Sequence, residues 1–168
     1  MLALGDGDGR ALAALLRANS GAAIDYVDLI PDMVELARAR SRRVAYQCAD
    51  ALTMPLTEGG YDLIVTHFFL DCFEERGIER LLERVASAAR PDARWVISEF
   101  RKPGLLVGML YLFFRITTGL RTRRLVDNHP LLGRCGFCLL RSEWAFFGQL
   151  SAELWTHPGA TPPADESV

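Results

Sequence analysis

LALGDGDGRALAALL, residues 2–16, places three glycines at alternate positions between a short apolar stretch and a segment with helical spacing. The apolar start predicts the end of a strand, and Leu12, Leu15 and Leu16 predict a helix over residues 10–18. Glycine lets the backbone turn sharply and lets a ligand approach the main chain closely. A strand, a glycine turn and a helix in this order therefore predict a ligand site at the first turn of the chain.

The rest of the chain continues to alternate strand-like and helix-like segments. Strands are expected over residues 1–4, 22–29, 44–48, 61–69 and 94–100, and helices over residues 10–18, 31–43, 74–90 and 105–118. Two final strands, residues 134–141 and 144–155, follow one another with a tight connection at Ser142-Glu143. This order predicts an α/β fold: a Rossmann-like three-layer sandwich whose mostly parallel sheet ends in an antiparallel C-terminal hairpin.

The length and the composition fit one ordinary globular domain. The chain has 168 residues, half of them hydrophobic, which is enough for a sizeable core. We expect the domain to span residues 1–155 and the proline-rich tail, residues 156–168, to be disordered. A net charge of −2 predicts no nucleic-acid partner. The first residues lack a signal-peptide pattern, so a cytoplasmic protein is expected.

Two of the four cysteines have a spacing that suits metal or redox sites. Cys135 and Cys138 form a C-x-x-C pair, but no two further ligands stand at a matching spacing. We therefore predict no metal site and no disulfide framework, and interpret the pair as two small, partly buried residues.

An apolar segment, GLLVGMLYLFF over residues 104–114, is too short to cross a membrane, which takes about 20 residues. It predicts a helix that is buried or that contacts a lipophilic ligand. Arg121, Arg123 and Arg124 follow it. Transient contact with a membrane surface and pairing with a second copy of the chain are therefore two further interpretations of this region.

Acidic residues follow the next two expected strands. Asp28 lies 19 residues after Gly9 and can accept hydrogen bonds from both hydroxyls of a ribose; alternatively it caps the following helix. Asp50, beside the Ala51 N–H, can accept from an adenine amine; alternatively it is a turn aspartate. The G-x-G-x-G spacing differs from the G-x-G-x-x-G that suits a pyrophosphate. Carboxylates in that turn would repel a pyrophosphate but tolerate a cationic sulfonium.

With these features, the chain resembles the class I S-adenosylmethionine-dependent methyltransferases. The stretches that carry the resemblance are ALGDGDGR, VDLIPDMVELAR, CADALTMPL, YDLIVTHFFLDCF and RWVISEF. Their order is most similar to the small-molecule branch that includes quinone-biosynthesis methyltransferases. The resemblance implies S-adenosylmethionine as cofactor, with Met33 near the adenine. The implied cofactor-binding residues are Gly5, Asp6, Gly7, Gly9, Asp28, Leu29, Met33, Asp50, Ala51, Thr66 and His67.

The sequence also departs from that family in three places. Ala3 stands where the family usually has an acidic residue two positions before the first glycine, and Ile30 replaces a serine-like cap. The chain also begins inside the first strand, where family members usually carry front helices. A methyltransferase for a small lipophilic or aromatic acceptor is therefore one hypothesis. The alternative is a catalytically impaired cofactor-binding or scaffold protein with the same fold.

Candidate catalytic residues gather after the fourth and fifth expected strands. In-line methyl transfer depends mainly on alignment, and a general base is needed only for a weakly acidic acceptor. His67 is a base candidate or a wall of the cofactor site, and Glu99 is a base candidate or an ion-pair partner of basic neighbours. His129 could face the acceptor, although a solvent-exposed loop histidine is the interpretation we favour. Asp71 and Arg101 lie in the same region. Phe68, Phe69, Phe73 and the run over residues 105–114 are expected as walls of an apolar acceptor pocket; alternatively they are core residues, which is the interpretation we favour for Phe69.

Overall fold

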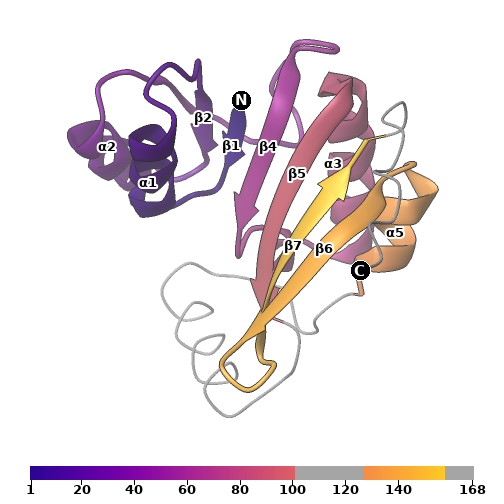
Figure 1. Cartoon of the computed structure of the whole chain (residues 1–168). Helices are drawn as coiled ribbons and strands as arrows, with labels where there is room; N and C mark the ends of the chain where they lie inside the picture. The colour runs from indigo at the N-terminus through magenta and orange to yellow at the C-terminus, as the bar shows by residue number, and fades with distance from the viewer. Residues whose placement is uncertain (101–126, 158–168) are drawn as a thin grey trace.

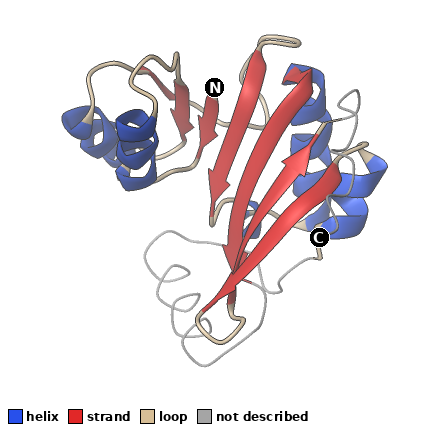
Figure 2. Cartoon of the chain, viewed as in Figure 1, coloured by secondary structure: helices blue, strands red, loops and turns tan. Residues whose placement is uncertain are grey.

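A seven-stranded sheet runs through the chain in this computed structural model, which describes residues 1–100 and 127–157 (Figures 1 and 2). The strand order is β3-β2-β1-β4-β5-β7-β6. Strands β1 to β5 pair in parallel, whereas β7 is antiparallel to both β5 and β6. The strands are β1 (Leu2–Leu4), β2 (Asp25–Asp28), β3 (Ala45–Cys48), β4 (Tyr61–His67), β5 (Ala89–Phe100), β6 (Cys138–Ala145) and β7 (Leu150–Thr156).

Helices cover both faces of the sheet, as Figure 1 shows. Helices α1 and α2 lie on one face, over β1, β2 and β3, while α3 and α5 lie on the other. The helices are α1 (Arg10–Ala18), α2 (Pro31–Arg40), the 3-10 turn η1 (Leu70–Cys72), α3 (Glu75–Ala88) and α5 (His129–Arg134). This arrangement confirms the three-layer α/β fold with an antiparallel C-terminal hairpin.

Alternation along the strands builds the two cores that hold these layers together. In β1, Leu2 and Leu4 belong to the larger core under α3, whereas Ala3 belongs to the smaller core under α1 and α2. All three side chains are at most 1% exposed. Because successive side chains of a strand point to opposite faces, a strand buried on both faces is apolar throughout. The core therefore fixes where β1 ends and where its glycine turn begins.

Strand β5 begins earlier than the sequence predicted. The expected helix over residues 74–90 ends at Ala88, and Pro91 lies inside β5 instead of stopping the helix. The pairing with β4 is irregular there, since it jumps from Tyr61↔Ala89 to Leu63↔Arg94. A proline cannot donate to a sheet ladder, so this irregularity accommodates it.

The C-terminal hairpin is also placed differently. Its connection was predicted at Ser142-Glu143, but these residues lie inside β6 and pair with Glu153 and Ala152 of β7. The turn instead follows Ala145, and residues 129–134 form helix α5 where only a loop was expected. Two smaller corrections concern β2, which starts at Asp25, and α2, which ends at Arg40.

Some expectations fall on residues that the structure does not describe. These are the apolar helix over residues 105–118, the arginine cluster that follows it, Arg101, and the tail beyond residue 157. Within the described ranges, no helix is long and apolar enough to span a membrane.

Candidate active site

The glycine turn lies where the sequence placed it, between the end of β1 and the start of α1. Gly5, Gly7 and Gly9 all have positive φ angles, of 62°, 60° and 77°. This left-handed region is accessible to glycine and strained for residues with a side chain. The turn therefore needs glycine at each of the three positions for its backbone path alone.

Packing is a second reason why two of these positions need glycine. A Cβ on Gly5 would lie 2.1 Å from the ring of Phe69, and a Cβ on Gly9 would lie 2.8 Å from Cα of Ala37 in α2. A Cβ on Gly7 would meet no atom of the described residues within 4 Å. Gly7 is thus the position of the turn where the main chain faces open space that a ligand can enter.

Asp6 holds the start of α1 in place. Its Oδ2 accepts a hydrogen bond of 2.8 Å from the Leu12 N–H in the first turn of α1. Asp6 thus caps the helix, because Gly9 at the N-cap position has no side chain that could do so. Its side chain is 5% exposed, and its Oδ1 lies 4.0 Å from Nε2 of His67. Burial, together with the charges of Asp8 and Asp28, raises the pKa of Asp6 to about 6, against a smaller lowering by the Leu12 hydrogen bond.

Asp28 ends β2 beneath the same turn. Its Oδ1 accepts a 2.9 Å hydrogen bond from the Ile30 N–H, and its side chain is also near Gly7. Burial raises the pKa of Asp28, while these hydrogen bonds counteract that rise. The carboxylate therefore forms the turn before α2 without capping the helix itself, and it lies beside the open glycine. Its ribose-binding role stays a prediction.

Tyr26 is a site residue that the sequence analysis missed. Its hydroxyl donates to the carbonyl oxygen of Gly7 at 2.5 Å and lies 3.4 Å from Oδ2 of Asp28. Residues two apart on a strand share a face, so Tyr26 and Asp28 in β2 could have been paired from the sequence. Tyr26 supports the glycine turn from below.

Apolar and acidic side chains border the turn on the β2 and β3 side. Leu29 is 67% exposed directly after Asp28, and Met33 is half-buried in the first turn of α2. After β3, Asp50 accepts a 2.8 Å hydrogen bond from the Leu52 N–H, which is the turn role, and Ala51 is buried. The Ala49 N–H donates to Asp28 O at 3.0 Å, so the ends of the two strands are tied together.

The end of β4 contributes His67 but not the Thr66 side chain. Thr66 is fully buried, and its hydroxyl accepts a hydrogen bond from the Trp95 indole at 3.1 Å. His67 lies next to Asp6, and burial lowers its pKa, which favours the neutral imidazole. Only His67 of this pair presents a side chain to the glycine turn.

Three aromatic rings, Phe68, Phe69 and Phe73, follow β4 and have different surroundings. Phe68 has a φ of 50°, is 43% exposed and packs against Phe100 with ring centroids 4.6 Å apart. Phe69 covers Gly5 and contacts Phe73 edge to face at 5.1 Å. Phe69 and Phe73 pack against the larger core, whereas Phe68 is exposed and packs on the half-buried Phe100.

The other two catalytic candidates lie on the opposite face of the sheet. His67 pairs in register with Ser98, so the next residue, Glu99, points to the α3 and α5 side. Its Oε1 accepts hydrogen bonds from the Phe69 and Leu70 N–H groups at 3.2 and 3.0 Å. Glu99 therefore fixes the segment that carries the aromatic rings.

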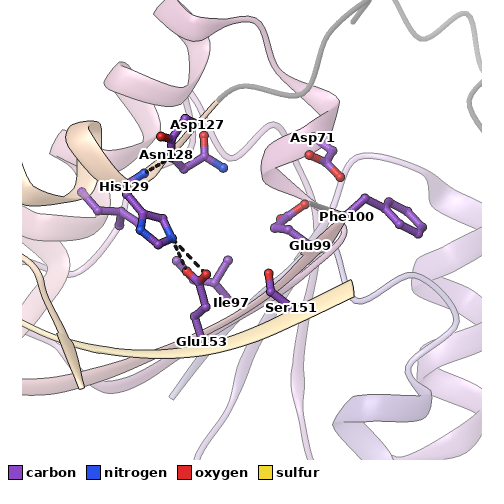
Figure 3. A pocket seen from close by; sticks show the side chains of 10 residues that line it. Asp71, Ile97, Glu99, Phe100, Asp127, Asn128, His129, Ser151 and Glu153 are labelled. Carbon is purple, nitrogen blue, oxygen red and sulfur yellow. Dashed lines mark hydrogen bonds and ion pairs between the residues drawn. The ribbon is translucent and has the colours of Figure 1, made fainter. Parts of the chain in front are cut away.

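His129 is not the solvent-exposed loop histidine that we favoured. It begins α5, and its Nε2 lies 2.9 Å from Oε1 of Glu153, which is itself 6% exposed (Figure 3). Its ring packs edge to face on Trp155 at 5.1 Å. The correction follows from the unexpected helix, which turns residue 129 inward over β7.

Metal and disulfide chemistry are not supported within the described residues. All four cysteines are free thiols, with Cys135 half-buried and Cys138 exposed. The described parts of the chain contain no cluster of three or more His, Cys, Asp or Glu side chains arranged to hold a metal ion.

Strand order, glycine turn and acidic strand ends together define a Rossmann-like cofactor-binding enzyme fold. Comparison with known proteins gives the family. Residues 1–92 match the family described as Methyltransferase domain. The chain therefore belongs to that family, the S-adenosylmethionine-dependent methyltransferases.

Relatives agree with this assignment. The chain is 33% identical to a demethylmenaquinone methyltransferase from Thermus thermophilus over 107 residues, 61% of this chain and 46% of the relative. It is 26% identical to a malonyl-[acyl-carrier protein] O-methyltransferase from Halorhodospira halophila over 134 residues, 78% of this chain and 44% of the relative. The chain thus spans less than half the length of these two relatives.

Solved structures confirm the fold. A TehB-like S-adenosylmethionine-dependent methyltransferase from Corynebacterium glutamicum superposes with a TM-score of 0.69 at 20% identity, over 93% of this chain and 78% of the other. An S-adenosylmethionine-dependent methyltransferase from Mesorhizobium loti gives 0.73 at 19% identity, over 93% and 89%.

The residues present fit S-adenosylmethionine, the cofactor of this family. Gly7 faces open space, a carboxylate lies beside it at the end of β2, and the exposed Leu29 offers an apolar surface next to that carboxylate. A nucleoside with a ribose, a flat aromatic base and a cationic end suits these kinds of group.

Proposed function

We propose that this chain binds S-adenosylmethionine at the glycine turn and transfers its methyl group to a small acceptor with a lipophilic or aromatic body. The observation that carries the proposal is the position of Gly7. This residue has a positive φ, faces open space and lies next to the Asp28 carboxylate. When bound, the cofactor supplies a methyl group on a cationic sulfonium, which is already a good leaving group.

The chain's own residues then bind and orient. Asp28 would accept hydrogen bonds from the ribose hydroxyls, and Asp50 with the Ala51 N–H would hold the adenine edge. Leu29 and Met33 supply apolar surface for the base. Buried carboxylates near a cation strengthen its binding because the local dielectric is low.

The acceptor side is formed by aromatic rings and one imidazole. The exposed ring of Phe68, packed against the half-buried Phe100, suits the flat or lipophilic body of an acceptor. His67 directly precedes Phe68 in the chain, and its Nε2 lies 4.0 Å from Oδ1 of Asp6 in the glycine turn. Burial lowers the pKa of His67, which favours the neutral imidazole. A neutral imidazole can accept a proton from an acceptor hydroxyl, while a more acidic phenol or enol needs no such base.

A first experiment separates binding from catalysis. Isothermal titration calorimetry with S-adenosylhomocysteine and with NADH should show binding of the first and not of the second. Formation of S-adenosylhomocysteine from S-adenosylmethionine with phenolic and quinol acceptors then tests transfer. Binding without turnover would favour the impaired or scaffold alternative, and a preference for NADH would exclude the methyltransferase proposal.

Asp28→Asn tests the site itself. The amide oxygen can still accept from the Ile30 N–H, so the turn before α2 is retained, but the charged acceptor for ribose hydroxyls is lost. We expect S-adenosylhomocysteine affinity to weaken by about 1–3 kcal/mol. Asp25→Asn, at the other end of β2, is the matched control and should leave that affinity unchanged. Equal affinity of Asp28→Asn and the parent would restrict Asp28 to its turn role.

A further inference from the structure

A polar cavity lies on the α3 and α5 face of the sheet, and no residue of the glycine turn lines it (Figure 3). Its volume is about 290 Å³, at the small end of the range for ligand sites. η1, the end of β5, the start of α5 and β7 surround it. Four carboxylates line it: Asp71, Glu99, Asp127 and Glu153.

Glu99 is the side chain that makes this cavity more than an acidic cluster. It is 6% exposed, and one oxygen, Oε1, accepts from the Phe69 and Leu70 N–H groups. The other oxygen, Oε2, is buried and receives no hydrogen bond from an N–H or O–H donor of the described residues; the carboxyl group of Asp71 is close enough to share a proton with it. Figure 3 shows the Glu99 carboxyl group projecting into the space between Asp71 and Ser151. A buried ionised oxygen without a donor is costly, so Glu99 holds a proton unless a donor from outside the described residues allows it to ionise.

A second acceptor in the same cavity has the same need. Oδ1 of Asn128 is buried without a hydrogen-bond partner in residues 1–100 and 127–157. Glu153 differs, because Nε2 of His129 and the Trp155 indole both lie within hydrogen-bond distance of its carboxylate. Two buried acceptors therefore lack donors within the described part of the chain.

Charge narrows the choice of ligand. Asp71, the acidic neighbour of Glu99, can supply a donor only when it is protonated. Among the described lining residues, His129 is the one that can carry positive charge, and it already faces Glu153. Within the described residues no cluster is arranged to hold a metal ion. An ammonium group carries a positive charge that favours ionised Glu99, and it supplies up to three N–H donors.

We propose that this cavity binds the ammonium group of a small primary or secondary amine, with Glu99 Oε2 and Asn128 Oδ1 as its acceptors. This inference does not depend on the proposed methyl transfer, because none of the cofactor-binding residues lines the cavity. Phe100 lines the cavity and also contacts Phe68, so a bound amine would lie beside these two aromatic rings.

The titration behaviour of Glu99 supplies an independent consequence. Burial, and then the neighbouring Asp71, raise the pKa of Glu99 well above its ordinary range. Asp127, Glu153 and His129 also face the cavity. A bound cation favours the charged carboxylate, so amine binding should release a proton from the protein.

The test uses the full chain with benzylamine as probe and benzyl alcohol as its uncharged counterpart. Calorimetry should show that benzylamine binds about tenfold or more tightly than benzyl alcohol. Glu99→Gln keeps an oxygen for the Phe69 and Leu70 N–H groups and should weaken benzylamine binding at least about tenfold. Glu143→Gln, which removes an exposed carboxylate from β6, is the control and should not change the affinity.

Three results would overturn the proposal. They are equal affinities for the amine and the alcohol, an equal loss in Glu99→Gln and Glu143→Gln, and no benzylamine binding at millimolar concentration. If Glu99→Gln fails to fold, the parent protein still gives a decision. Titration in two buffers of different ionisation enthalpy should then show proton release on benzylamine binding, and its absence would count against the proposal. S-adenosylhomocysteine binding, measured separately, tests the cofactor site, so a failure of the amine proposal can be distinguished from a failure of the proposed function.

Discussion

Gly7 is the residue on which the cofactor site depends most directly. The three glycines of the turn share positive φ angles, but Phe69 covers Gly5 and Ala37 contacts Gly9. Those two contacts leave no room for a side chain at Gly5 or Gly9, so packing within the chain explains glycine there. Among the described residues no such contact exists at Gly7, so its open face is available for the ligand.

Gly7→Val should abolish binding of S-adenosylhomocysteine while the chain still folds. The branched side chain fills the open face, and its left-handed backbone costs about 1–2 kcal/mol. Gly59→Val is a matched control, because Gly59 also has a positive φ of 56° and no described atom within 4 Å of an added Cβ. Calorimetry and thermal unfolding of both variants separate strain from blocked binding. If both variants lose ligand binding equally, backbone strain, and not a blocked ligand site, explains the effect of Gly7→Val.

Asp6 places a buried carboxyl group next to the site and should make stability depend on pH. Its pKa is raised from 3.8 to about 6, so the folded chain holds this proton more tightly than the unfolded chain. The stability that protonated Asp6 contributes is complete below 3.8 and is lost as the pH rises through about 6. Above that pH the ionised side chain destabilises the fold.

Asp6→Asn should therefore gain stability relative to the parent as the pH rises. The amide can still accept from the Leu12 N–H, but it carries no charge. Between pH 4 and pH 8 the difference in unfolding free energy, variant minus parent, should increase by about 1–3 kcal/mol. Urea unfolding without cofactor at both pH values measures it. A difference that does not change with pH would mean that Asp6 titrates normally in the folded chain.

At the scale of elements, the parts predicted from the sequence are those with strong local patterns. The apolar run YDLIVTH gives β4, and the spacing of Ile78, Leu81 and Val85 gives α3, because each pattern matches one buried face. Helix α5 is only six residues long and contains Gly133 and Pro130, so no helical stripe indicates it. Its burial of Leu131 and Leu132 depends on packing against α3, which a local pattern does not contain.

The site was predictable to the extent that it follows strand ends. Asp28 and the glycines could be placed together from the sequence because parallel strands end at one edge of the sheet. The amine cavity was not found as a unit, because Glu99 and Glu153 are brought to one face only by the pairing of β5 with β7. That pairing depends on the hairpin turn, whose position was predicted four residues too early.

The turn between β6 and β7 explains that error and gives a prediction. Phe146 and Phe147 have positive φ angles of 48° and 54°, in a position where Asn and Gly are preferred. They are 68% and 102% exposed, so little packing compensates for the strain. The double substitution Phe146→Asn with Phe147→Gly should stabilise the chain by about 1–2 kcal/mol. Urea unfolding tests this, and a loss of stability would show that the two rings have a partner.

At the scale of the whole molecule, the proposed cofactor site lies where the turns after β1, β2 and β3 meet. The turn after β1 is tied to β2 by the Gly5 N–H to Val27 O hydrogen bond, and β2 to the turn after β3 by the Ala49 N–H. Helices α1 and α2 cover the β1 to β3 half and form a smaller core than the one under α3. Ligand binding at this edge should therefore stabilise the half of the sheet with the smaller core.

Saturation with S-adenosylhomocysteine should raise the melting temperature and slow amide exchange in particular segments. At a ligand concentration 100 times the Kd, the gain is about 2.7 kcal/mol, or roughly 5–10 °C for a domain of this size. Added protection should concentrate in residues 5–12, 28–34 and 49–54, because these loops surround the ligand, and should be small in β6 and β7. Asp28→Asn should reduce both effects at the same ligand concentration, whereas Asp25→Asn should retain them. Protection spread evenly over β6 and β7 would mean that the ligand binds elsewhere on the sheet.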